Sequence, residues 1–227
     1  MSEEPPSLTR FDAVCFDMDG TLLDLNFRDP EMNDVRRDLH ALFAEHGIDR
    51  SFSPLLGTLE EALATLATER GEAIRDRVER QARERITAAD VHAARHQAVR
   101  RFAPAVLEAL GDDGVPFVVV TNNSRRGAEI ALEASGLPEP AGLVARDDVD
   151  RPKPDPEMVT AALELLETSP DQVAMVGDRP SDARSAKRAA DSSSFAVTTV
   201  LLDPGGPSET DPDVDYHVQS LASLGDL

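Results

Sequence analysis

Five short apolar runs recur along the chain, and each is short enough to form a β-strand. They cover residues 13–16, 116–120, 143–145, 173–176 and 195–202. The runs are nearly continuous rather than alternating, and the last is rich in β-branched residues. This pattern is typical of strands that are buried on both faces of a parallel sheet. It therefore predicts an α/β fold with its sheet in the protein interior.

Helical patterns lie between these runs. They cover residues 127–135, 156–167 and 181–190, and the first of them stops at Gly136, a residue that commonly ends helices. Strands that alternate with helices predict right-handed crossovers and a doubly wound parallel sheet of the Rossmann-like kind.

Residues 25–102 carry almost no strand pattern. Helix-like stretches cover residues 31–45, 59–69 and 72–103, and Gly47, Gly57 and Gly71 are expected to break them. The alternative is a set of ordinary crossover helices, but most crossovers need only one helix. We therefore expect an all-helical cap domain at 25–102, inserted into a catalytic core of residues 10–24 and 103–227.

Charge narrows the possible partners. The 227 residues include 43 acids and 23 bases, for a net charge of −20, and only two of the bases are lysines. A field of this sign repels nucleic acid and anionic membranes, so neither is an expected partner. A strongly acidic, solvated surface is also typical of halophilic-type proteins that work at high salt. No apolar run approaches 18 residues, so no membrane span is expected.

Two features favour a cytoplasmic location. Cys15 is the only cysteine and lies within an apolar run, so we expect it to pack in the core, where no internal disulfide can form. The first ten residues contain neither a basic region nor an apolar segment, so no secretory signal is expected there.

Polar groups stand where three of the predicted strands end. In open α/β sheets the ligand crevice lies outside these carboxyl ends, so the side chains should converge. They are Asp17, Thr121 and Asp178, and the residues just after them add Asp19, Asn122 and Asp182. Four carboxylates at one place require a cation, and hard oxygen ligands indicate Mg²⁺.

Four segments carry a family resemblance. Residues 16–22 read Phe-Asp-Met-Asp-Gly-Thr-Leu and resemble DxDGT, the first motif of the haloacid dehalogenase (HAD) superfamily. Residues 120–122, Val-Thr-Asn, resemble the second motif. Residues 151–156, Arg-Pro-Lys-Pro-Asp-Pro, resemble the third. Residues 177–182, Gly-Asp-Arg-Pro-Ser-Asp, resemble the fourth, GDxxxD. The resemblance covers about residues 10–24 and 103–202, and the place of the helical insertion is similar to that of the helical-cap subclass, which includes phosphoglycolate phosphatase.

The resemblance implies roles for the first motif. Asp17 would attack phosphorus and form an aspartyl-phosphate. Asp19 would be the general acid and then the general base, and its backbone carbonyl would bind Mg²⁺. Gly20 would let the backbone turn closely around the phosphate, and Thr21 would orient that loop.

The other motifs would complete the site. Thr121 and the Asn122 backbone N–H would bind phosphoryl oxygens, and Lys153 would neutralise Asp17 and the phosphate. Asp178 would be a Mg²⁺ ligand. Asp182 would bind the metal, directly or through water, or hold Lys153 in place.

The resulting hypothesis is an enzyme, a Mg²⁺-dependent phosphatase that hydrolyses a small phosphomonoester, with the cap excluding water and selecting the leaving group. Arg28, Arg36 and Arg37 are candidates to meet a substrate carboxylate. A phosphomutase of the β-phosphoglucomutase type shares all four motifs and is the first alternative. A non-catalytic binding or regulatory protein on the same fold is the second. Dehalogenases of this type lack the second aspartate, which Asp19 supplies here.

Overall fold

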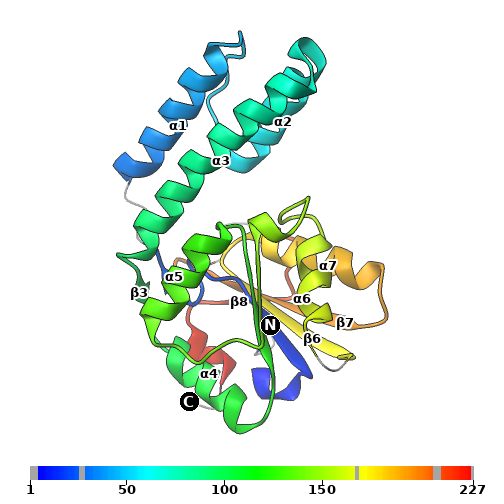
Figure 1. Ribbon diagram of the computed structural model, residues 1–227. Helices are drawn as coiled ribbons and strands as arrows, with labels where there is room; N and C mark the ends of the chain where they lie inside the picture. Colours follow the sequence, from blue (N-terminus) through cyan, green and yellow to red (C-terminus); the bar gives the residue numbers. More distant parts are fainter. Residues whose placement is uncertain (1–4, 26–28, 167–168, 207–210, 226–227) are drawn as a thin grey trace. The chain divides into compact units, whose positions relative to one another are not determined.

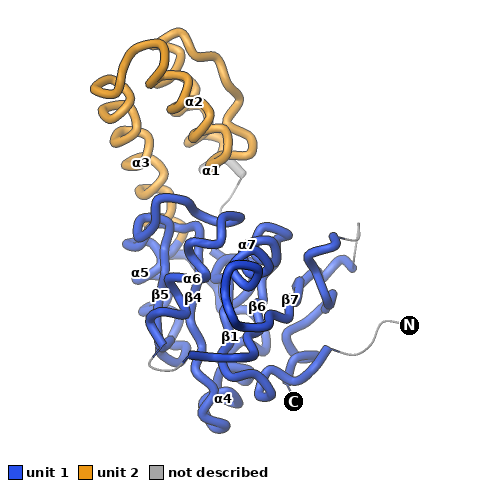
Figure 2. The backbone as a smooth tube through the Cα atoms, turned by 90° about the vertical axis from the view of Figure 1, so that its right-hand side faces the viewer, with its two compact units in different colours: residues 1–25, 94–227 blue, residues 26–93 orange. Residues whose placement is uncertain are grey.

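The chain forms two compact units, seen in a computed structural model that describes residues 5–25, 29–166, 169–206 and 211–225 (Figure 2). The first unit contains residues 1–25 and 94–227, and the second contains residues 26–93. We describe each unit by itself.

The first unit is built on one parallel sheet in the strand order β5-β4-β1-β6-β7-β8 (Figure 1). Its strands are β1 (Ala13–Phe16), β4 (Phe117–Thr121), β5 (Gly142–Ala145), β6 (Gln172–Gly177), β7 (Ala196–Leu202) and β8 (Tyr216–Val218). The central strand β1 pairs on both sides, with Cys15 opposite Val118 and Met175. The expected doubly wound α/β fold is confirmed.

Helices cover both faces of this sheet. α4 (Ala103–Asp112) and α5 (Arg125–Ser135) lie on one face, and α6 (Glu157–Glu164) and α7 (Pro180–Asp191) pack together on the other (Figure 1). Local chemistry sets their ends. Ser124 Oγ accepts from the Gly127 backbone N–H at the start of α5, and Gly136, with φ of 67°, ends it. The sequence pattern did not separate α4, and it extended α6 to residue 167, which lies outside the described residues.

The sheet interior is apolar. All four residues of β1 and all five of β4 are buried, and α6 and α7 add Met158, Val159 and Ala186 to the cluster on their side. Cys15 is fully buried there, and burial raises the pKa of its thiol to about 12. Its predicted role as a packing residue is confirmed.

The second unit is all helical. Its described helices are α1 (Asp29–Ala44), α2 (Leu55–Arg70) and α3 (Glu72–Ala94). The last residue of α3, Ala94, belongs to the first unit. They share an apolar cluster in which the Phe43 and Phe52 rings lie 5.1 Å apart. Gly71, with φ of 87°, separates α2 from α3. Gly57 lies inside α2, so its expected role as a helix breaker is wrong; the helix begins directly after Pro54.

A short two-stranded sheet lies where the chain leaves and re-enters the first unit. β2 (Leu23–Asp24) pairs antiparallel with β3 (Ala98–Val99), and the Arg100 N–H donates to the Leu22 carbonyl at 2.9 Å. The expected helix at 72–103 therefore ends at Ala94. The helical unit ends at residue 93 rather than 102, because the paired strands β2 and β3 belong to the first unit.

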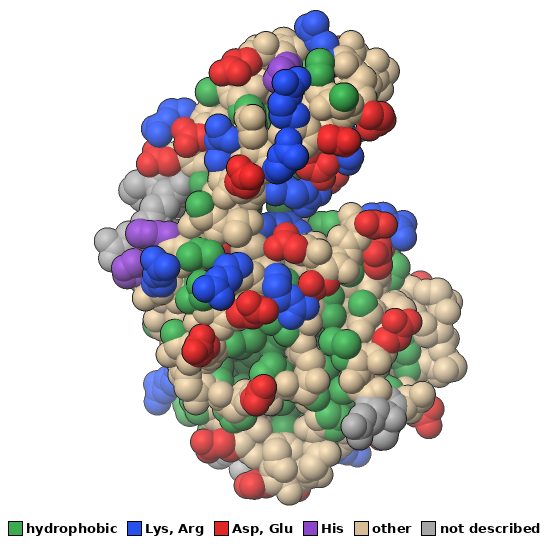
Figure 3. Space-filling view, viewed as in Figure 1, with side chains coloured by type: hydrophobic (Ala, Val, Ile, Leu, Met, Phe, Trp, Pro, Cys, Tyr) green, Lys and Arg blue, Asp and Glu red, His purple; other side chains and the backbone are tan. Residues whose placement is uncertain are grey.

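Three 3₁₀ helices complete the described elements, at Leu8–Arg10, Arg146–Asp148 and Leu221–Leu224. The surface of the helical unit mixes acidic and basic side chains (Figure 3), as in the ion pairs of Arg83 with Glu79 and Glu60. Within the described residues, no helix has the length and apolar character needed to cross a membrane.

Candidate active site

Asp17 is the first residue after the central strand β1. Its backbone N–H donates to the Val176 carbonyl at 2.9 Å, so the β1–β6 ladder continues through this residue and fixes its position. Its side chain is buried, and Oδ1 accepts from Lys153 Nζ at 2.6 Å. The two residues are 136 positions apart in the sequence, and the sheet brings them together.

Lys153 uses all three of its ammonium protons. Nζ lies 2.6 Å from Asp17 Oδ1, 2.7 Å from the Val120 carbonyl and 2.7 Å from Asp182 Oδ1. Burial alone would lower the pKa of Lys153, but the charges and hydrogen bonds of Asp17 and Asp182 raise it overall. The lysine therefore carries its charge in the interior, where only fully paired charges are tolerated.

Asn122 holds the lysine loop with its side chain. Asn122 Nδ2 donates to the Lys153 carbonyl, and Oδ1 accepts from the Lys153 N–H, each at 3.0 Å. The buried Arg146 in turn donates from Nη1 to the Asn122 carbonyl at 3.1 Å. The sequence assigned Asn122 only a backbone role and did not single out Arg146. The pairing of the Asn122 side-chain amide with the Lys153 backbone cannot be recognised in the sequence, because it exists only once folding brings the two segments together.

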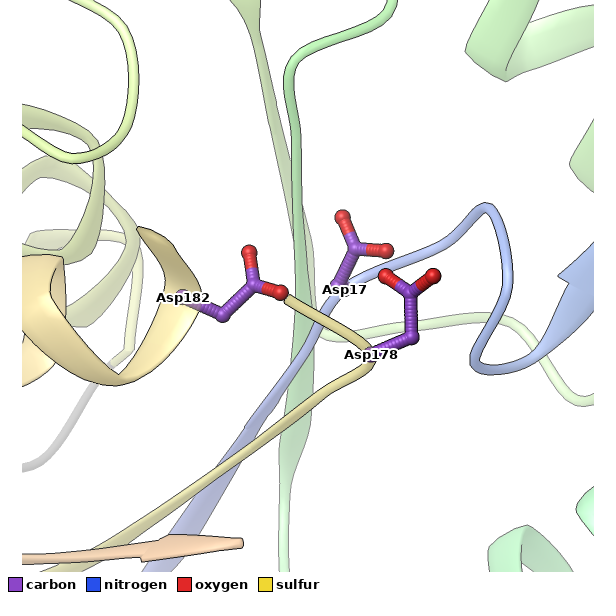
Figure 4. A group of neighbouring side chains, drawn as sticks. All are labelled: Asp17, Asp178 and Asp182. Carbon is purple, nitrogen blue, oxygen red and sulfur yellow. The ribbon is translucent and has the colours of Figure 1, made fainter. Parts of the chain in front are cut away.

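Three carboxylates, from the segments after β1 and β6 and from the start of α7, converge as Figure 4 shows. Asp17, Asp178 and Asp182 each offer an oxygen within 4.8 Å of the others. Burial raises the pKa of Asp17 to about 8; Lys153 acts against this shift, and Asp182 and Asp178 add to it. Burial, followed by the charge of Asp182, raises the pKa of Asp178 to about 6. Like charges this close are stable only with a cation or bound protons.

The donor set fits a hard divalent cation. Asp178 Oδ1 is buried and has no hydrogen-bond partner among the described residues, so it has an unused acceptor. Asp182 is more occupied, because Oδ1 contacts Lys153 and Oδ2 accepts from the Arg179 N–H at 3.0 Å. The contact with Lys153 matches one of the two roles expected for Asp182.

Asp19 stands apart from this acidic group. Its Oδ1 accepts from the Leu25 N–H at 3.0 Å, and it is not among the three converging carboxylates. Burial raises the pKa of Asp19, while the Leu25 hydrogen bond and the charges of Arg179 and Arg100 act in the opposite direction and Asp24 acts with burial. The two aspartates of the first motif therefore have different neighbours.

Two glycines allow the loops to approach. Gly20 has φ of 85°, and a Cβ there would lie 2.2 Å from Asp178 Oδ2. A Cβ at Gly177 would lie 2.3 Å from Asp182 Oδ2. Both glycines are thus required by close contact with a carboxylate. The sequence identified Gly20 but gave Gly177 no such role.

The two threonines of the site are fully buried. Thr121 Oγ1 accepts from the Asn123 N–H at 3.2 Å. Thr21 Oγ1 has no hydrogen-bond partner within the described part of the chain, and its expected role in orienting the loop stays a prediction. The expected loop is nevertheless tight, since Gly20 N–H donates to the Leu23 carbonyl at 2.7 Å.

Of the arginines considered for a substrate carboxylate, two are described and both lie on α1. Arg36 donates to Asn33 Oδ1 at 3.2 Å, and Arg37 pairs with Asp34 at 2.9 Å. Arg28 lies outside the described residues.

Known proteins resemble this chain over most of its length. A phosphoglycolate phosphatase of Rhodospirillum rubrum is 35% identical over 126 residues, which is 55% of this chain but only 46% of that protein. A pyrophosphatase PpaX of Oceanobacillus iheyensis is 26% identical over 217 residues, covering 93% of this chain and 94% of that one.

Solved structures share the fold. A hydrolase from Pseudomonas syringae has a TM-score of 0.66 at 23% identity and covers 93% of this chain and 95% of its own. CbbY from Rhodobacter sphaeroides, in complex with phosphate, has a TM-score of 0.64 at 23% identity and covers 95% and 96%. The family model for haloacid dehalogenase-like hydrolases matches residues 11–190, which include all four motifs. The chain therefore belongs to the haloacid dehalogenase-like hydrolase family.

Proposed function

We propose that this protein is a magnesium-dependent phosphatase that hydrolyses a small phosphomonoester through an aspartyl-phosphate on Asp17. The observation that carries this proposal is the position of Lys153, bonded to both Asp17 and Asp182 at the edge of an acidic group. One ammonium thus holds a buried carboxylate in place beside oxygens suited to a cation.

Asp17 attacks phosphorus through a carboxylate oxygen, and the bond to the leaving alcohol breaks. The hydrogen bond from Lys153 keeps the carboxylate in position and offsets the negative charge of the phosphoryl group. Thr121 and the Asn122 N–H, at the end of the neighbouring strand β4, bind the phosphoryl oxygens.

Asp19 donates a proton to the leaving oxygen and then accepts one from the water that hydrolyses the intermediate. Burial raises its pKa, which suits a group that must hold a proton near neutral pH. The Leu25 N–H fixes one of its oxygens, so the carboxyl group is oriented before substrate arrives.

Magnesium would be held by Asp17 and Asp178, with the Asp19 carbonyl and Asp182 as the remaining candidates from the protein. When bound, it neutralises the clustered charge and polarises the phosphoryl oxygens. Asp178 Oδ1, which accepts no hydrogen bond from any described residue, supports this assignment.

The relatives' names support a small phosphorylated substrate, since one is named phosphoglycolate phosphatase and another pyrophosphatase. The test is phosphate release from a panel of phosphomonoesters and pyrophosphate, with Mg²⁺ and with EDTA. We expect release that requires Mg²⁺ and is abolished in Asp17→Asn. A folded wild-type protein that releases no phosphate from any compound would overturn the proposal. A requirement for a sugar bisphosphate would instead indicate the mutase.

A further inference from the structure

Positive charges are distributed unevenly around the two aspartates of the first motif. Lys153 contacts the nucleophile Asp17 directly. Two arginines lie near the loop of the first motif: the Arg100 N–H donates to the Leu22 carbonyl, and Arg179 Nε lies 3.8 Å from Asp178 Oδ1. The charges of both act to lower the pKa of Asp19. In a chain with net charge −20, two guanidinium groups beside a general acid are unexpected. Since that acid protonates the leaving group, they lie on the side where the leaving group departs.

Arg100 is fixed next to the catalytic loop. Its N–H donates to the Leu22 carbonyl at 2.9 Å, directly after the pairing of β2 with β3, and Leu22 is three residues from Asp19. Its Nε is buried and has no hydrogen-bond partner among the described residues. A buried cationic N–H without an acceptor is costly, so an acceptor supplied by a ligand would be favoured.

Arg179 approaches from the fourth motif. It follows Asp178, and its N–H donates to Asp182 Oδ2, which fixes its backbone. Its Nε lies 3.8 Å from Asp178 Oδ1, too far for a hydrogen bond, and its side chain is 70% exposed. The guanidinium is therefore largely exposed, next to one of the three carboxylates of the site.

We propose that Arg100 and Arg179 bind a second negatively charged group, a carboxylate or phosphate on the leaving group of the substrate. Planar guanidinium groups suit both anions. The preferred substrates are then phosphate esters or anhydrides whose leaving group is itself an anion. This inference rests on the proposed phosphatase function, and it assigns substrate selection to two residues of the sheet unit.

The test compares kcat/KM for 2-phosphoglycolate and pyrophosphate, which have anionic leaving groups, with that for ethyl phosphate, which does not. The variants are Arg100→Met, Arg179→Met and the double variant. Each charge-assisted hydrogen bond contributes roughly a factor of ten. We therefore expect the kcat/KM of the double variant to fall by about 100-fold for a substrate with an anionic leaving group. For ethyl phosphate the fall should be at least tenfold smaller. Separate responses of the two anionic compounds identify the carboxylate or the phosphate as the group bound.

Arg10→Met is the charge-matched control, because Arg10 is exposed and precedes β1, at the amino ends of the strands. It should leave kcat/KM unchanged for all three compounds. An equal loss on all three compounds, or no loss on any, would overturn the inference while leaving the phosphatase intact. If the wild type releases no phosphate, the proposed function fails instead. Calorimetry then measures the binding of 2-phosphoglycolate and of ethyl phosphate to Asp17→Asn. The inference requires that 2-phosphoglycolate binds more tightly, and that this difference is lost when both arginines are also replaced.

Discussion

The two units of this protein bury different kinds of groups. The sheet unit buries Asp17, Lys153 and Asp182 at the carboxyl ends of its strands, and each of them is tied to the others or to a backbone group. The helical unit buries an apolar cluster, and Asp90 is the one charged residue among its described buried residues. The ion pair of Arg83 with Glu79 in this unit is partly exposed.

This difference separates stability from chemistry. Apolar burial is non-directional and stabilises any well-packed arrangement of helices. Buried charges cost free energy unless every partner is correctly placed, so they are found where a reaction requires them. The four experiments that follow test this separation, from the largest expected effect to the smallest.

The largest effect should come from Asp17→Asn. Removing the nucleophile should lower kcat by roughly 10⁴-fold or more, while the circular dichroism spectrum stays unchanged. Asp12 provides the control on the same chain segment, because it lies before β1 and accepts from the Asp171 and Gln172 N–H groups. Asp12→Asn should retain activity. If Asp17→Asn kept the wild-type rate, the buried charges of the sheet unit would have no part in the reaction.

Gly20→Ala should follow. Its Cβ would lie 2.2 Å from Asp178 Oδ2, and the residue has positive φ, so the acidic group must shift. We expect kcat/KM to fall by about 100-fold or more, as for a misplaced catalytic group. Gly136→Ala has a similar φ of 67° but open space around its Cβ. It should cost about 1 kcal/mol in urea unfolding and leave the rate unchanged. Equal rates for both variants would contradict the close-contact argument.

In the helical unit we expect the effect to be on stability. Leu63 is buried in the apolar cluster, and Leu63→Ala should lower the free energy of unfolding by about 2–5 kcal/mol. Arg83→Met, which removes surface ion pairs, should change it by no more than about 1 kcal/mol. Urea titration of both variants measures the difference. A reversed order would mean that the surface charges, and not the apolar cluster, hold the helices together.

The smallest effect concerns the net charge of −20, which repels an anionic substrate until salt screens it. We expect the KM for 2-phosphoglycolate to fall by a few-fold as KCl rises from low levels toward molar. Circular dichroism at each salt concentration controls for folding. A KM that is flat or rises over this range would show that the overall field does not reach the site.

The family could be inferred from the sequence because its motifs are local. Three of the four lie at the end of a strand-like run, and a parallel sheet brings such ends to one edge. The third follows the run at 143–145 by several residues. Lys153 stood out because it is one of two lysines in the chain. The convergence of Asp17, Asp19, Asp178 and Asp182 was predicted for the same reason. The oxygens of Asp17, Asp178 and Asp182 do lie within 4.8 Å of one another, and Asp19 is not in this group.

Other features depend on contacts between distant segments. The pairing of Leu23 with Val99 limits the helical unit at residue 93, and two-residue strands are too short to leave a periodic pattern. The amide of Asn122 meets the Lys153 backbone 31 residues away. Sequence spacing carries no information about such pairs.

The sequence by itself determined which residue types are available for chemistry and which strand ends they follow, because hydrophobic periodicity and motif order are properties of the chain. The tertiary structure decided how those residues are used. It occupied both oxygens of Asp182 with Lys153 and the Arg179 N–H, and left one oxygen of Asp178 without a hydrogen-bond partner among the described residues. It also set Arg179 beside Asp178, with Nε 3.8 Å from Oδ1, and tied the Arg100 backbone to Leu22. The physical reason is that hydrogen bonds and charge interactions depend on distance and direction, and only the folded chain fixes both.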